Sequence, residues 1–95
     1  MNKRFDELNI NNNIINKEIK YDYGRYVGQV VNGLREGKGI FYWNDGDRYE
    51  GEWRNGKKEG KGIFYYNNGK IEEGIWENDE LSKKWIIYIS LNLKK

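Results

Sequence analysis

Residues 49–69 read YEGEWRNGKKEGKGIFYYNNG, and the sequence around them repeats this unit. Moved back by 23 residues, the stretch lies on residues 26–46, YVGQVVNGLREGKGIFYWNDG, and 13 of the 23 positions of the full unit are identical. Unrelated windows of this composition would agree at about one or two positions, so the period is genuine. Moved forward, the unit meets residues 72–94 with 7 identities, and most of its glycines are lost there.

Each unit is predicted to be a β-hairpin. In residues 49–54, Tyr, Gly and Trp alternate with charged residues, which is the period-two pattern of a strand with one polar face. Asn55-Gly56 follows, and both residues tolerate the positive φ of a tight turn. Residues 61–66 are β-branched and aromatic, which favours a second strand, and the glycine that ends residues 67–69 predicts the next turn.

The glycines inside the predicted strands need a reason, because each costs roughly 0.5 to 1 kcal/mol relative to alanine. Gly39 and Gly62 stand two residues before Phe41 and Phe64, and Gly51 has large neighbours on the same strand face. We expect large rings to lie flat over the bare backbone of the neighbouring strand, which recovers the stability that a strand glycine loses.

The pattern YxGxW, then NG, then GxGIFY with a glycine at the closing turn resembles the MORN repeat (membrane occupation and recognition nexus). The resemblance covers two well-matched copies and one degenerate copy, about residues 24–90. It implies an all-β fold, an elongated single-layer antiparallel sheet of consecutive β-hairpins with tyrosines and tryptophans along one side of a shallow trough. The residues that carry it are Tyr26, Gly28, Gly33, Gly37, Gly39, Phe41, Gly46, Tyr49, Gly51, Trp53, Gly56, Gly60, Gly62, Phe64 and Gly69.

The chain divides into a polar N-terminal arm, residues 1–13, and a repeat domain, residues 14–95. The asparagine-rich arm favours disorder, although Phe5, Leu8 and Ile10 leave a short helix open. The repeat domain comprises a half-repeat 14–25, the repeats 26–48 and 49–71, and a degenerate capping repeat 72–95. Residues 14–90 are predicted to form one meander, in which a strand at about 15–22 pairs with the strand starting at Arg25, with turns near Asn32-Gly33, 44–46, Asn55-Gly56, 67–69 and Asn78-Asp79.

The last copy is expected to close the sheet. Trp85 stands 23 residues after Gly62, so its ring is predicted to fill the space that a further repeat would otherwise fill. Ile86, Ile87 and Ile89 are expected to form the closing strand. Lysines would discourage another chain from pairing there, namely Lys83, Lys84, Lys94 and Lys95.

Two candidate surfaces follow from the pattern. An interaction surface on the aromatic side comprises Tyr26, Phe41, Trp43, Tyr49, Trp53, Phe64, Tyr66 and Trp76. The charges are nearly balanced, 17 basic against 15 acidic, but the second repeat is distinctly basic. Its lysines fit a solvated loop that protects a sheet edge, and a contact with anionic lipid is the alternative, through Arg54, Lys57, Lys58 and Lys61.

The chain shows no motif for catalysis, a cofactor or a metal. It has no histidine or cysteine, so a general base near neutral pH, a thiolate and a disulfide framework are all excluded. Residues 33–38 and 56–61 resemble a phosphate-binding loop, but the glycine spacing is one residue short and no Ser or Thr follows the lysine. Stacking of nucleic-acid bases on the aromatic residues is opposed by a net charge of only +2.

These observations predict a non-catalytic module for protein interaction or scaffolding. The alternatives are peripheral binding to an anionic or phosphoinositide membrane surface, or an accessory fragment of a larger enzyme such as the phosphatidylinositol phosphate kinases in which the family occurs. The expected partner is another protein, and a homo-oligomer through a sheet edge stays open. Since the sequence has neither a signal peptide pattern nor an apolar run long enough to span a bilayer, the expected location is the cytoplasm, with attachment to a membrane or the cytoskeleton as an option.

Overall fold

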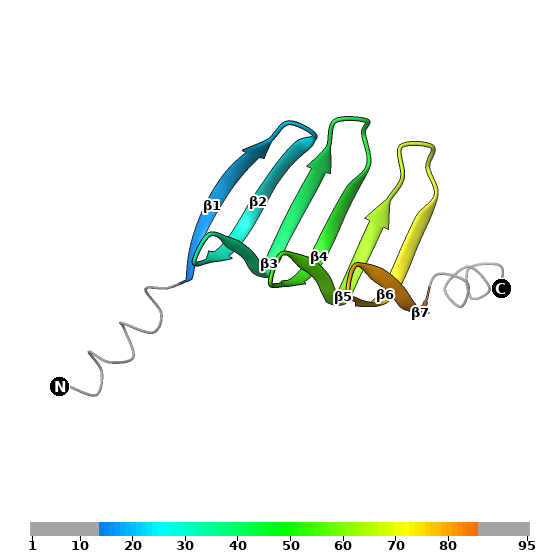
Figure 1. The fold of residues 1–95 in the computed structure, drawn as a ribbon. Helices are drawn as coiled ribbons and strands as arrows, with labels where there is room; N and C mark the ends of the chain where they lie inside the picture. The colour runs from blue at the N-terminus through cyan, green and yellow to red at the C-terminus, as the bar shows by residue number, and fades with distance from the viewer. Residues whose placement is uncertain (1–13, 86–95) are drawn as a thin grey trace, which may run out of the picture.

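The computed structural model describes residues 14–85, which form seven strands joined in chain order into one sheet (Figure 1). All neighbouring strands are antiparallel, as in a meander. This confirms the predicted single-layer sheet of consecutive hairpins. The strands are β1 (Ile14–Tyr21), β2 (Gly24–Val31), β3 (Leu34–Trp43), β4 (Arg48–Arg54), β5 (Lys57–Tyr65), β6 (Ile71–Glu77) and β7 (Glu80–Lys84).

The hairpin turns lie where the turn residues predicted them. Asn32-Gly33, Asn55-Gly56 and Asn78-Asp79 all have positive φ at both positions, between 50° and 82°. This is the conformation of a type I′ turn, which matches the twist of the flanking strands and favours Asn and Gly. The predicted pairing of a strand at about 15–22 with the strand starting at Arg25 is present as well, since β1 pairs with β2 over all eight of its residues without a register shift.

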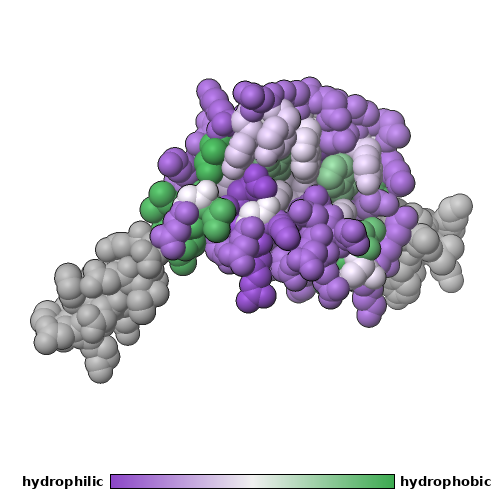
Figure 2. Space-filling view, viewed as in Figure 1, coloured by the Kyte–Doolittle hydropathy of each residue, from purple (hydrophilic) through white to green (hydrophobic). Residues whose placement is uncertain are grey.

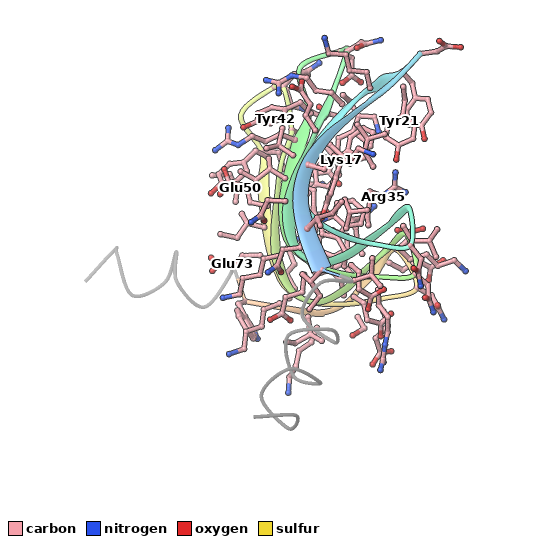
Figure 3. All side chains as sticks on the ribbon, turned by 90° about the vertical axis from the view of Figure 1, so that its left-hand side faces the viewer. Lys17, Tyr21, Arg35, Tyr42, Glu50 and Glu73 are labelled. Atoms are coloured by element: carbon pink, nitrogen blue, oxygen red, sulfur yellow. The ribbon has the colours of Figure 1, made fainter. Side chains whose placement is uncertain are left out.

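The sheet is curved, and its concave face looks toward the viewer in Figure 1. Figure 3 shows the curvature from the β1 edge, with Tyr21 and Arg35 on the concave side and Tyr42, Glu50 and Glu73 on the convex side. Because side chains alternate across a strand, each strand contributes to both faces. The hairpin tips after β2, β4 and β6 bend toward the concave side, so the sheet forms a trough.

The core is a layer of aromatic rings on the concave face. Its buried members are Tyr26, Val30, Phe41, Tyr49, Trp53 and Trp76, each at most 4 % exposed, and Phe64 packs against them. The predicted ring-over-glycine packing is confirmed. A Cβ added to Gly39 would meet the Tyr26 ring, and one added to Gly62 would meet the Tyr49 ring. Each tyrosine hydroxyl donates a hydrogen bond to a backbone carbonyl of its own strand, Tyr26 to Gln29 at 2.7 Å.

Hydrogen bonds between the hairpins recur with the 23-residue period. Gly56 and Asp79 occupy equivalent turn positions, and their amides donate to the carbonyls of Arg35 and Lys58 at 2.9 and 3.0 Å. At the opposite loops, the amide nitrogens of the equivalent Asn44 and Asn67 side chains donate to backbone carbonyls of the preceding loop at 2.7 and 2.6 Å. The repeated residues therefore hold neighbouring hairpins together at both ends.

The last hairpin departs from the expected alignment. Gly28 pairs with Gly39 and Gly51 with Gly62, but Gly74 pairs with Lys84, so the prediction that Trp85 stands in this place is wrong by one residue. The cause is a shorter bulge. In the full repeat Gly60 adopts φ +88°, which is unfavourable for the lysine at the equivalent position 83.

A second sequence difference in the last unit removes a hydrogen bond that stabilises the longer bulge. The Glu52 carboxylate accepts a hydrogen bond from the Lys61 amide at 2.9 Å, and the equivalent position in the last unit is Ile75, which has no acceptor in its side chain. After the shorter bulge, the Trp85 amide donates to the carbonyl of Glu73. The arm at residues 1–13, the closing strand expected around Ile86, Ile87 and Ile89, and Lys94 and Lys95 lie outside the described residues.

Candidate interaction surface

A row of aromatic rings crosses the upper part of the concave face. Tyr21 and Tyr23 stack at 5.3 Å between ring centroids, and Tyr23 stacks on Phe41 at 5.7 Å. The row continues from Phe41 to Trp43 at 4.6 Å, to Phe64 at 5.2 Å and to Tyr66 at 4.5 Å. The outer members, Tyr23 above all at 52 % exposure, keep part of their surface in solvent. We call these six rings the aromatic row.

Figure 2 shows this face with pale and green side chains across its middle, bordered above and below by hydrophilic residues. The rings of the buried core lie beside the row, share Phe41 with it and fix its position. Trp53 meets Tyr26 and Tyr49 edge to face, and Trp76 meets Tyr49 in the same way, at centroid distances from 5.1 to 5.5 Å. The row is therefore a preformed apolar surface with a polar rim, the composition typical of a binding site.

Two basic residues project over the rings from the bent hairpin tips. Arg35 lies over Tyr21, Phe41 and Trp53, with 4.9 to 5.4 Å from its Cζ to the ring centroids. Lys58, one repeat later, lies 5.6 to 5.8 Å from four ring centroids, those of Trp43, Tyr49, Phe64 and Trp76. Both distances permit cation–π attraction. The third equivalent position is Leu81, which packs against the core without a charge.

The two cations differ in what neutralises them. The Nζ of Lys58 lies 3.6 Å from an Asp79 carboxylate oxygen, and its side chain is only 13 % exposed. Burial lowers the pKa of Lys58, and the neighbouring Asp79 opposes that shift. Arg35 donates from Nη2 to the Gly56 carbonyl at 2.6 Å, and it has no carboxylate within salt-bridge distance among residues 14–85. Of the two cations over the rings, Arg35 is therefore the one without a carboxylate partner in this part of the chain.

The predicted interaction residues divide into two groups. Five are core residues with at most 4 % of their surface exposed, namely Tyr26, Phe41, Tyr49, Trp53 and Trp76. Their side chains are therefore occupied with packing. The other three, Trp43, Phe64 and Tyr66, are half-buried members of the aromatic row, in which Phe41 is the buried ring. The structure adds Tyr21, Tyr23 and Arg35 to this surface, and the recurrence of a basic residue at 35 and 58 is the sequence signal that could have identified Arg35.

The four basic residues of the second repeat do not form one patch. Arg54 and Lys57 are exposed and face each other beside the Asn55-Gly56 turn. Lys58 is held over the rings on the concave face, whereas Lys61 is exposed beside Gly62, on the opposite, convex face. A single planar surface could contact only some of these charges at once.

The convex face carries a different arrangement. The Arg25 guanidinium lies 4.2 Å from the Tyr42 ring centroid, and that of Arg48 lies 3.8 Å from the Tyr65 ring. These stacked pairs cover their tyrosines. A shallow depression of about 530 Å³ runs beside them along the sheet, lined by Val27, Gly28, Lys38, Gly39, Ile40, Glu50, Gly51, Glu52 and Lys61.

No group of three metal-ligating side chains occurs in the part of the chain that the structure describes. Residues 14–85 likewise contain no helix able to cross a bilayer. The family model for the MORN repeat matches residues 26–48 and 49–71, the same two units that the 23-residue period delimits. A comparison with curated proteins finds no match to this chain. The matched repeats and the hairpin meander they build show that the chain is a MORN repeat protein.

Proposed function

We propose that this chain is a non-catalytic interaction module that binds a segment of another protein in its concave trough. The observation that carries the proposal is the aromatic row. Five of its six rings keep part of their surface in solvent over three consecutive hairpins, whereas Phe41 and the neighbouring core rings are closed. Tyrosine and tryptophan on a rigid support are the side chains that most often anchor protein interfaces. Scaffolding is the biological role that such a module would serve.

The position of the charges favours a carboxylate-bearing partner. Arg35 extends over the rings without an ion-pair partner in the described part of the chain, so an Asp or Glu of the bound segment would meet an available guanidinium. Apolar side chains of the same segment would lie on Trp43, Phe64 and Tyr66. A guanidinium can bind a carboxylate through two parallel hydrogen bonds, which adds orientation to the apolar contact.

The shape of the trough disfavours a membrane as the first partner. A flat bilayer surface would touch the hairpin tips before it reached rings that lie on a concave face (Figure 3). The basic residues are divided between the two faces, and Lys58 is neutralised by Asp79. Recruitment to anionic lipid usually depends on a cluster of four or more basic residues acting together.

The experiment is affinity capture with the full chain, compared among surface variants of equal fold. Trp43→Ala combined with Tyr66→Ala removes two half-buried rings of the trough. Tyr42→Ala combined with Tyr65→Ala removes two half-buried rings from the convex face and is the matched control. We expect the trough variant to lose a specific protein partner and the convex variant to keep it.

A second arm measures sedimentation with vesicles that contain anionic lipid and vesicles that do not. Binding to anionic vesicles that persists at about 0.15 M salt, where exposed charges are screened beyond about 8 Å, would favour the membrane as partner. A partner protein captured equally by the parent and by the trough variant would contradict the assigned surface. Repeating the capture with Arg35→Gln tests the carboxylate contact separately from the apolar one.

A further inference from the structure

Strand β1 forms one end of the described sheet, and only its β2 side is paired within residues 14–85. It is a regular eight-residue strand without proline or a bulge, in contrast to β3 and β5, whose register shifts. Ile14 and Ile15 are 48 % and 47 % exposed. Such an edge presents unpaired backbone donors and acceptors to any strand that fits it.

The adjoining turn determines which residues of β1 point their backbone N–H and C=O groups away from β2. Tyr21 pairs with Gly24 across the two-residue turn, and a turn of this kind closes with hydrogen bonds between those two residues. In an antiparallel ladder the bonded residues alternate with residues whose N–H and C=O point the other way. Lys20, Glu18 and Asn16 therefore direct their backbone groups outward, away from β2.

We propose that a second copy of this chain pairs with β1 in antiparallel orientation, with Ile19 on the twofold axis. A twofold axis perpendicular to the sheet keeps the concave faces of both copies on the same side. Odd-numbered residues of one copy then lie opposite odd-numbered residues of the other, and even-numbered opposite even-numbered. With Ile19 opposite its own counterpart, Glu18 of each copy lies opposite Lys20 of the other, and both present the outward backbone groups that this pairing needs. On the concave face of this dimer interface, Lys17 of one copy lies opposite Tyr21 of the other.

The side chains select this register over its neighbours. A shift that centres the axis on Glu18 places two carboxylates opposite each other, and one centred on Lys17 or Lys20 opposes two ammonium groups. Like charges directly opposite destabilise a strand pair, whereas opposite charges stabilise it. Within one copy, moreover, Lys20 lies opposite Arg25, and Glu18 reaches Arg25 only at 3.5 Å between Oε2 and Nη1. A second Glu18 beside Lys20 would balance this excess of positive charge.

The other sheet edge fits a second copy less well. Strand β7 has five residues, and its exposed end carries Lys83 and Lys84. Pairing β1 with β7 of another molecule would also repeat without closing and produce filaments. The β1–β1 pairing closes after two copies and gives a continuous sheet made of two seven-stranded halves.

The test is the association state of the full chain, measured by sedimentation equilibrium from about 10 µM to 1 mM, because an interface of this size belongs to the weak class. We expect a reversible dimer. Glu18→Lys and Lys20→Glu each turn two attractive pairs into two repulsive ones, so each variant alone should raise the dimer Kd by about tenfold or more. Glu73→Lys makes the same charge change on the convex face away from β1 and should leave the Kd unchanged.

Mixing the two edge variants gives the decisive result. The E18K copy carries a lysine at both positions and the K20E copy carries a glutamate at both, so both cross-strand pairs between the two are attractive. The mixture should therefore form a heterodimer that neither variant forms with itself. The double variant E18K/K20E should dimerise like the parent. Three results would each overturn the proposal: monomers at every concentration, growth beyond the dimer, or a dimer whose Kd does not change with these charge exchanges. Monomers at every concentration are expected if another segment of the same chain covers the edge.

Discussion

The Nε1 of Trp53 donates a hydrogen bond of 3.1 Å to the carbonyl oxygen of Gly39, which lies on the neighbouring strand and belongs to the preceding repeat unit. Trp76 makes the same bond of 3.1 Å to Gly62. These bonds join successive units through the core. A tryptophan of this kind stabilises the fold by burying its ring and by tying one repeat to the next.

We therefore expect Trp53→Ala to cost about 3 to 5 kcal/mol, because the residue is almost fully buried and its loss leaves a cavity between two tyrosine rings. Trp53→Phe retains most of the ring and removes the hydrogen bond, so it should cost less. Thermal and urea unfolding measure both. Trp43→Ala, at a half-buried position of the aromatic row, is the control and should cost clearly less than Trp53→Ala.

The glycine pairs predict a second effect on stability. Gly39→Ala places a methyl group against the Tyr26 ring, which is fully buried and cannot move aside. Overpacking of this kind costs typically about 1 to 3 kcal/mol. Gly33→Asn is the matched control, since nothing lies within 4 Å of its added Cβ and asparagine tolerates the φ of +80°. Equal unfolding midpoints for the two variants would contradict the tight packing of ring on backbone.

Alkaline pH should destabilise the protein through its tyrosines. Burial raises the pKa of Tyr26 to about 12 and also raises that of Tyr49, whereas both titrate near 10 when unfolded. A folded pKa above the unfolded one gives stability that is complete below pH 10 and is lost as pH rises toward 12. Tyr26→Phe removes one of these groups, so the unfolding free energy of the variant should fall less steeply over this window.

Lys58 should give an opposite and smaller dependence of the unfolding free energy on pH, at lower pH than the tyrosines. Its folded pKa is lowered mainly by burial, so just below pH 10.5 the unfolded state binds more protons and stability rises with pH. Lys58→Met removes the desolvated charge and keeps the side-chain length over the rings. We expect its stability at pH 7 to equal or exceed that of the parent. Asp79→Asn, which retains an acceptor for the Lys58 amide but removes the ion pair, should destabilise by less than about 1 kcal/mol because Asp79 is 47 % exposed.

Most of the fold follows from local pattern. The period-two alternation, the Asn-Gly turns and the strand glycines specify where each hairpin begins and ends, and the core tyrosines and tryptophans share one strand face. The position of the Lys58 side chain over the rings does not follow from the sequence pattern. A lysine in a glycine-rich hairpin reads as a solvated loop residue, whereas the bulge at Gly60 bends the tip over the concave face and brings Lys58 onto the rings. That bend depends on backbone twist, which a linear pattern does not display.

The register of the last hairpin differs from the predicted one for a related reason. A fixed spacing of 23 residues assumes that every unit contains the same bulge, and residues 80–84 pair with β6 through a shorter one. The identities at Trp76 and Asn78 hide this difference because both precede the bulge.

The last prediction tests that explanation directly. Lys83→Gly restores the residue that can adopt positive φ, and Ile75→Glu restores the carboxylate that accepts the amide in the bulge, so the double variant should adopt the longer bulge and move Trp85 opposite Gly74. Backbone NOEs from Gly74 would then connect to residue 85 instead of residue 84. Lys83→Ala combined with Ile75→Glu is the control, because alanine disfavours the required φ and should leave Lys84 in place. If both double variants keep the Gly74–Lys84 pair, the bulge is set by residues other than Gly60 and Glu52, and the register of β7 has a different cause.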